Sequence, residues 1–257
     1  MSEPQKAYDP FARGLEVVEF ATKNNVKLRL LGAVAFRTHC PKFGYMQERL
    51  GRTISDLDFA AYRKEHKGVD MVFAQLGFEA DIIASTMSAG KRAIFYDKTN
   101  QWKVDIFYDK LEMCHDIHFQ DRLELDSPTI SLVDLLLEKM QIVRLESKDT
   151  IDTIMLLREH EIGPTDKETV NSAYLAKLCS DDWGLWKTVT TNLAKVQSYM
   201  TPQEQPNLGQ DDIADVNKKI EVLLSTIEQQ PKSKNWEKRA KVGEKKKWYR
   251  EVEELSR

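Results

Sequence analysis

The chain of 257 residues is long enough for one large domain or for a core with a smaller appended part. Hydrophobic residues make up 41% of it, charged residues 31%, and the mean hydropathy is −0.51, which excludes a disordered or fibrous protein. The apolar runs are shorter than the ~20 residues of a membrane-spanning helix, and the N-terminus lacks the apolar core of a secretory signal. We therefore expect a cytoplasmic protein with no membrane partner. Three widely spaced cysteines argue against a disulfide framework: Cys40, Cys114 and Cys179.

The first 130 residues mix helix and strand patterns. Apolar spacing and turn residues predict helices over 11–23, 32–37 and 69–76, and strands over 26–31, 54–61, 78–84 and 115–119. The apolar runs 91–96 and 102–108 are joined by five polar residues, which is typical of an antiparallel hairpin. This half of the chain is therefore expected to contain a sheet.

After Pro128 the strand signals stop and helical patterns take over. The predicted helices cover 131–145, 149–160, 167–179, 183–199, 211–229 and 233–255, with prolines at the breaks. The fold class is α+β: a small mixed sheet with flanking helices, followed by an all-helical C-terminal part. We expect three parts: a core over 1–130, a helical domain over 131–205 and a helical extension over 206–257 that carries a basic tail.

Three aspartates form the first candidate site. Asp56 and Asp58 are two residues apart in a predicted strand, so both point to one face while Leu57 points to the other. Two adjacent carboxylates repel each other unless a cation lies between them, and hard oxygen ligands suit Mg²⁺. Asp105 stands between two apolar residues of a later strand and could supply a third ligand. A solvated strand face is an equally simple interpretation of the pair.

A glycine turn and several basic residues are candidates for contacts with phosphate. Gly32 ends an apolar strand and precedes a helical segment, where free backbone N–H groups let a phosphate approach closely. A plain turn is also possible there, because no second glycine makes a dinucleotide fingerprint or a P-loop. Lys91, Arg92 and Arg52 could contact phosphates, although exposed basic residues need no such reason.

The ordered set of these motifs resembles the nucleotidyltransferase fold of the DNA polymerase beta superfamily. The resemblance covers about residues 15–160 and consists of the Gly32-Ala33 turn, the Asp56-Leu57-Asp58 strand and the third acid, Asp105. A helix lysine, Lys139, and the later Lys-Asp-x-x-Asp stretch at 148–152 resemble the AbiEii type of nucleotidyltransferase toxin and its minimal relatives. The family usually has Gly or Ser where this chain has Ala33.

The resemblance implies transfer of a nucleoside monophosphate from a nucleoside triphosphate to an acceptor hydroxyl, on RNA or on a protein, with release of pyrophosphate. It implies that Asp56, Asp58 and Asp105 hold Mg²⁺, or alternatively Mn²⁺, and that Asp105 helps to orient or deprotonate the hydroxyl. Gly32 and Ala33 would bind the nucleotide together with basic residues, namely Arg52, Lys91, Arg92 and Lys139. An antitoxin is an expected partner of the toxin-like type.

Local helix geometry gives a further expectation for Lys139. On a helix over 131–145 it lies at the edge of the apolar stripe that contains Leu136 and Met140, so its ammonium must reach solvent or meet an anion. We expect it to face the metal cleft, so that Lys139→Met weakens triphosphate binding without loss of stability. The following stretch has a simpler interpretation, with Lys148 and Asp152 as an i,i+4 pair and Ser147 at a helix start.

Two other function classes stay open. The first is a nucleotide-binding protein that keeps the fold without turnover, which Ala33 makes plausible. The second is an RNA-associated interaction protein that acts through its C-terminal tail, where residues 232–250 contain nine Lys or Arg against two Glu, a local charge of +7, together with Trp236 and Trp248. An ordinary solvated helix with i,i+4 pairs also fits this tail.

Overall fold

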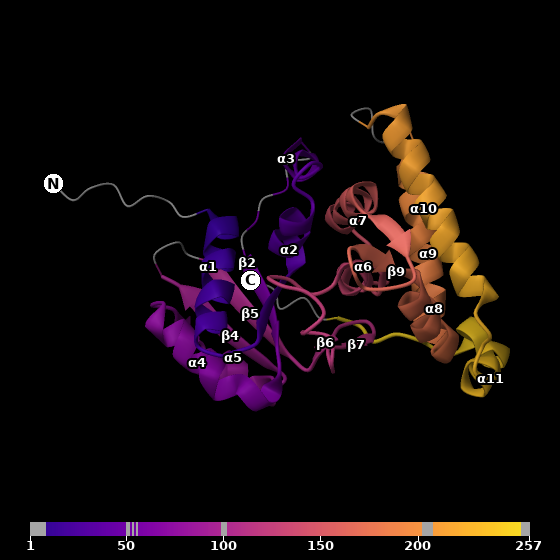
Figure 1. Cartoon of the computed structure of the whole chain (residues 1–257). Helices are drawn as coiled ribbons and strands as arrows, with labels where there is room; N and C mark the ends of the chain where they lie inside the picture. The colour runs from indigo at the N-terminus through magenta and orange to yellow at the C-terminus, as the bar shows by residue number, and fades with distance from the viewer. Residues whose placement is uncertain are drawn as a thin grey trace. The chain divides into compact units, whose positions relative to one another are not determined.

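The computed structural model describes residues 9–49, 52, 54, 56–98, 102–201 and 208–252. The chain forms two compact units (Figure 1). Unit 1 comprises residues 1–38, 53–111 and 118–130, and unit 2 comprises residues 39–52, 112–117 and 131–257. In the described part of the chain, no helix combines the length and apolar composition needed to span a bilayer.

Unit 1 is built on a five-stranded mixed sheet with the strand order β1-β2-β5-β4-β3. Strands β2 and β5 are parallel, and the other neighbouring pairs are antiparallel. The strands are β1 (Leu28–Leu31), β2 (Asp56–Ala61), β3 (Glu79–Ala80), β4 (Arg92–Asp97) and β5 (Trp102–Tyr108). The helices are α1 (Pro10–Lys23), α2 (Gly32–His39), α4 (His66–Gln75) and α5 (Ile82–Met87), with a 3₁₀ turn at Arg63–Glu65.

The core of unit 1 lies on one face of this sheet. Phe73 of α4 packs edge-on against Phe59 of β2 and stacks on Phe95 of β4. Gly14 of α1 lies against Leu30 of β1, where a Cβ would be 3.0 Å from the leucine side chain. In β2 and β4, Phe59 and Phe95 thus point to the face that α1 and α4 cover, and the residues on either side of them point to the other face.

Unit 2 is mainly helical, with α10 packed along α8 and α9 (Figure 1). Its helices are α3 (Tyr45–Arg49), α6 (Leu132–Met140), α7 (Ser147–Glu159), α8 (Ser172–Asp181), α9 (Trp183–Tyr199), α10 (Gln210–Gln229) and α11 (Lys234–Val242), followed by a 3₁₀ turn at Gly243–Lys245. Two short parallel strands, β8 (Glu161–Gly163) and β9 (Thr169–Asn171), lie between α7 and α8. The remaining strands, β6 (Lys110–Glu112) and β7 (Asp116–His118), form a separate two-stranded sheet.

The α+β fold class expected from the sequence is confirmed, but several of the predicted elements differ in detail. The segment 78–84 is not one strand, because the Asp81 carboxylate caps a helix by accepting a hydrogen bond from Ala84 N–H. The part after Pro128 is not entirely helical, since β8 and β9 pair there. The last predicted helix ends at Val242, where Gly243 takes a positive φ of 56° that stops it.

Candidate functional site

The strand register of unit 1 places the three predicted aspartates on one face of the sheet. Asp58 is the direct partner of Asp105 across the parallel β2–β5 pair, and Asp56 is the partner of Lys103. Paired residues on neighbouring strands point to the same face, so Asp56, Asp58, Lys103 and Asp105 lie on the face opposite the phenylalanine core. We call these four residues, together with Gly32, the acidic face.

Gly32 brings the backbone of the β1–α2 turn into direct contact with one of these carboxylates. Its φ is +69°, and a Cβ at this position would be 2.5 Å from Asp58 Oδ2. Leu31, just before it, pairs with Asp58 across the β1–β2 ladder. Glycine is therefore needed twice here, for the backbone angle and for the space beside the carboxylate. Ala33, the next residue, is buried.

Gly32→Ala should destabilise the fold and disturb Asp58 at the same time. A left-handed backbone costs a non-glycine residue about 1–2 kcal/mol, and the new methyl group must also displace the carboxylate. Gly77→Ala is a matched control, because Gly77 has a φ of +81° but nothing within 4 Å of its Cβ position. Thermal unfolding should show a larger loss for Gly32→Ala than for Gly77→Ala. Equal losses would mean that the contact with Asp58 is of no consequence.

Asp105 is buried and balanced by two cations, Lys103 of its own strand β5 and Arg92 of the neighbouring strand β4. Its side chain is 5% exposed, and Oδ2 lies 3.2 Å from Lys103 Nζ and also pairs with the Arg92 guanidinium. Oδ1 is inaccessible to solvent and has no hydrogen-bond partner, and neither has Arg92 Nε. One oxygen of the third acid is therefore neutralised within unit 1, while the other is left without a donor.

The side chains of the acidic face are of the types that bind a hard divalent cation. Three carboxylates on one face are ligands that Mg²⁺ or Mn²⁺ accepts, and the unpaired Asp105 Oδ1 is a buried acceptor that a cation could satisfy. In the described ranges, however, no group of three or more His, Cys, Asp or Glu side chains is arranged to hold a metal ion. Coordination by all three acids therefore stays a prediction.

The other basic candidates lie in different surroundings. Lys91 is exposed directly before β4, and Arg92 pairs with Asp105 as described. Arg52 belongs to unit 2, where its guanidinium lies 3.0 Å from Asp152 Oδ2. Phosphate contacts by these residues stay a prediction. Lys103 was missed from the sequence, although its spacing of two from Asp105 on a strand is the signal that would have placed both on one face.

Lys139 lies at the centre of a buried cluster of charges in unit 2. Its Nζ is 2.9 Å from Glu138 Oε1, 3.4 Å from Asp152 Oδ2 and 3.6 Å from Asp149 Oδ1. Arg52 and Gln47 also contact Asp152, Gln47 through a hydrogen bond of 2.8 Å. Burial lowers the pKa of the Lys139 ammonium, but the carboxylates outweigh it and hold that pKa above its ordinary value.

This cluster corrects two expectations from the sequence. Lys139 is 8% exposed and surrounded by carboxylates, so its ammonium meets anions and does not reach solvent. Lys139→Met is therefore expected to lower stability, contrary to the expectation from the sequence, while contact of Lys139 with a triphosphate stays a prediction. Lys148 does not pair with Asp152: it pairs with Glu146 at 2.9 Å, while Asp152 is fully buried. Helix spacing alone placed the Lys148–Asp152 pair, whereas the actual partners of Asp152 come from residues distant in sequence.

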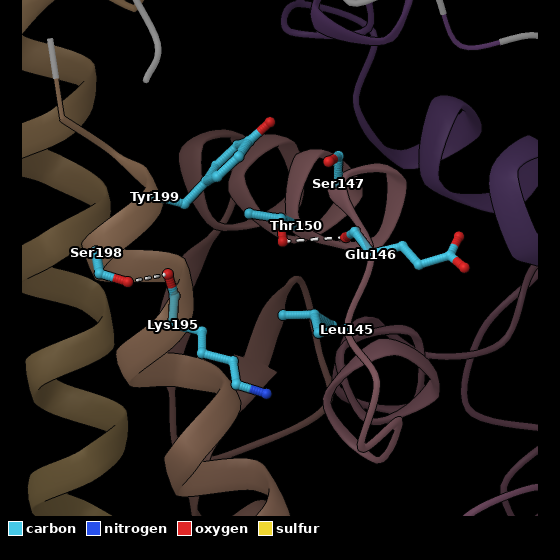
Figure 2. A pocket seen from close by; sticks show the side chains of 7 residues that line it. All are labelled: Leu145, Glu146, Ser147, Thr150, Lys195, Ser198 and Tyr199. Atoms are coloured by element: carbon cyan, nitrogen blue, oxygen red, sulfur yellow. Dashed lines mark hydrogen bonds between the residues drawn. The ribbon is translucent and has the colours of Figure 1, made fainter. Parts of the chain in front are cut away.

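Two pockets are lined by residues other than the five of the acidic face. A pocket of about 320 Å³ lies between the start of α7 and the end of α9 (Figure 2). Two of its hydroxyl groups donate to backbone carbonyls close by in sequence, Thr150 Oγ1 to Glu146 O at 3.2 Å and Ser198 Oγ to Lys195 O at 2.8 Å. Lys195 Nζ donates to Val143 O at 3.3 Å. A second pocket, of about 480 Å³ in unit 1, is lined by Phe95 and Tyr108, which point to the sheet face opposite Asp105, and also by Arg92. Neither pocket brings together side chains that are arranged for catalysis.

Comparison with known proteins adds little to this geometry. No family model matches the chain, and no curated protein matches it either. Among solved structures, a "putative nucleotidyltransferase from H. pylori" is similar over 86% of this chain and 98% of its own, with 14% sequence identity and a TM-score of 0.38.

Proposed function

We propose that this protein is a metal-dependent nucleotidyltransferase that moves a nucleoside monophosphate from a nucleoside triphosphate to an acceptor hydroxyl. The observation that carries the proposal is the acidic face: a left-handed glycine turn lies against Asp58, and Asp58 is paired across parallel strands with Asp105. This combination brings backbone N–H groups, which suit a phosphate, beside carboxylates, which suit the cation that a triphosphate carries.

Each group of the acidic face has a separate role in the proposal. Asp56 and Asp58 would hold Mg²⁺ or Mn²⁺, which when bound supplies neutralisation of the negative charge on the phosphates. The Gly32 turn binds the triphosphate through its backbone. Asp105 orients the attacking hydroxyl or accepts its proton, and Arg92 and Lys103 hold Asp105 in place. The hydroxyl oxygen bonds to the α-phosphorus, the bond to the β-phosphate oxygen breaks, and pyrophosphate leaves.

The acceptor belongs to RNA or to a protein, and an antitoxin would be the partner if the chain acts as a toxin. These finer statements rest on the sequence resemblance to the AbiEii type alone.

A catalytically degenerate nucleotide-binding protein is the second candidate. One observation favours it: Asp105 already pairs with two cations, Arg92 and Lys103, which neutralise the charge that a metal would otherwise meet. In this case the acidic face would bind a nucleoside triphosphate without transferring the nucleoside monophosphate.

Labelled substrates distinguish the two candidates. The full chain is incubated with each α-³²P nucleoside triphosphate, with Mg²⁺ or Mn²⁺, and with either total RNA or RNA-free lysate protein. Label in RNA or protein that disappears with EDTA supports the transferase, and the labelled fraction identifies the acceptor. Binding of a triphosphate by isothermal titration without any labelled product supports the degenerate protein. Absence of both binding and transfer would contradict both.

A further inference from the structure

The C-terminal helix α11 presents a row of free lysines to solvent. Lys234, Lys238 and Lys241 are spaced i, i+4 and i+7, so they form one stripe along the helix, and all three are exposed. Their ammonium groups have no ion pair among the described residues, and α11 contains one acidic residue, Glu237. Lys245 and Lys246 follow α11 and are exposed, and their ammonium groups likewise have no ion pair among the described residues. We call these five residues the lysine row.

The other cations of the same segment are already used inside unit 2. Arg239 lies 4.7 Å above the Trp183 ring and donates to Gly243 O at 2.7 Å. Arg250 donates to Met113 O at 3.0 Å and pairs with Asp116. The cations that give the local charge of +7 therefore fall into two groups. Some bind the segment to the rest of unit 2, and the others are exposed to solvent.

The tryptophans of this segment are packed and not free to stack on bases. The Trp236 ring lies 5.2 Å from that of Trp186, and the Trp248 ring lies 6.1 Å from that of Trp183. Trp248 Nε1 also donates to Thr188 Oγ1 at 3.1 Å. The aromatic side of α11 is thus turned to α9 and the lysine side to solvent, so Trp236 lies on the side of α11 away from the lysines.

We infer that the lysine row is a binding site for the phosphodiester backbone of a nucleic acid. The row binds this backbone without base stacking and without sequence preference. Lysines one helical turn apart are about 6 Å apart along the axis, and unpaired ammonium groups are point-charge partners of successive phosphates. A membrane surface is less suited, because an interfacial helix needs an apolar face for the lipid, and that of α11 is occupied by tryptophans. The inference goes beyond the proposed transfer reaction and does not depend on the acidic face.

Point substitutions test the site, because deletion of the segment would remove Trp236 and Trp248 from their packing. The test variant is Lys234→Gln/Lys238→Gln/Lys241→Gln. The matched control is Lys148→Gln/Lys177→Gln/Lys218→Gln, which removes the same charge from three exposed lysines of unit 2 outside α11. Binding of labelled 20-nucleotide single-stranded RNA and of duplex DNA is measured by fluorescence anisotropy across a salt series, and thermal unfolding checks that both variants are folded.

The wild type and the control should bind with the same salt dependence. In the test variant the slope of log K against log salt for RNA should be shallower by about 2, since each phosphate contact on a single strand contributes about 0.7. The affinity at 0.1 M salt should fall by about tenfold to 100-fold on the same basis. The probe that binds more tightly identifies the nucleic acid. Equal losses in both variants would overturn the inference, as would tighter binding to phosphatidylserine vesicles or to polyglutamate than to either nucleic acid.

Discussion

Replacement of Asp58 by asparagine should lower nucleotidyl transfer by about 10³-fold or more. The substitution removes one negative charge at nearly constant volume, and loss of a metal ligand forfeits several kcal/mol of transition-state stabilisation, at 1.36 kcal/mol per tenfold change in rate. The fold should be retained, because Asp58 is half-buried and its loss reduces repulsion from the neighbouring carboxylates. Transfer of labelled nucleotide under single-turnover conditions gives the rate.

Asp70→Asn provides the control for this prediction. Asp70 is an exposed residue of α4 in the same unit, so its replacement makes the same change in charge away from the acidic face. It should leave the rate within about twofold of wild type, in keeping with the small effects of surface substitutions. If Asp58→Asn is as active as Asp70→Asn, Asp58 has no part in the mechanism. If Asp58→Asn is inactive but still binds the triphosphate, Asp58 acts in the transfer step and not in binding.

Lys139→Met should be the most destabilising of the substitutions considered. It removes the central cation from a cluster in which Glu138, Asp149 and Asp152 are all buried. Breaking a buried ion pair on one side costs about 3–5 kcal/mol, since the remaining charges lose their compensation. Urea unfolding should therefore show a lower midpoint than for wild type. Lys148→Met, which removes an exposed lysine paired with Glu146, should be nearly neutral.

The pH dependence of this loss follows from the sign of the Lys139 pKa shift. Burial acts to lower the pKa, but the carboxylates raise it above its unfolded value. The stabilisation from the protonated lysine is then fully present below the unfolded pKa and is lost only as pH rises through the higher folded pKa. The difference in unfolding free energy between wild type and Lys139→Met should be constant from about pH 6 to 9. A midpoint equal to that of Lys148→Met would contradict the prediction.

The common face of the three aspartates was predictable because side chains alternate between the two faces along each strand. Period two in β2 placed Asp56 and Asp58 together, and the same alternation in β5 placed Asp105 on the side opposite Val104 and Ile106. The short strands β8 and β9 were not predictable, since three-residue strands are too short to show a period. Gln47 and Arg52 could not be assigned as partners of Asp152, because long-range contacts leave no local pattern in the sequence.

Lys139 illustrates the limit of helix geometry as a guide. The spacing correctly predicted a helix, but every residue of α6 is buried, including the three charged ones. An amphipathic interpretation assumes that one side of a helix meets water, and it fails for a helix enclosed on all sides. Burial of the charges is then compensated by other charges from α7 and from Arg52, which the composition of α6 itself does not reveal.

The tryptophan packing around α9 also decides what intrinsic fluorescence reports. Four of the five tryptophans of the chain take part in it, and the fifth, Trp102, is at the start of β5. Emission on unfolding will therefore follow mainly the release of the C-terminal segment from α9. Loss of the sheet in unit 1 contributes little to that signal, so variants of the acidic face need circular dichroism or hydrogen exchange to reveal whether the sheet is intact.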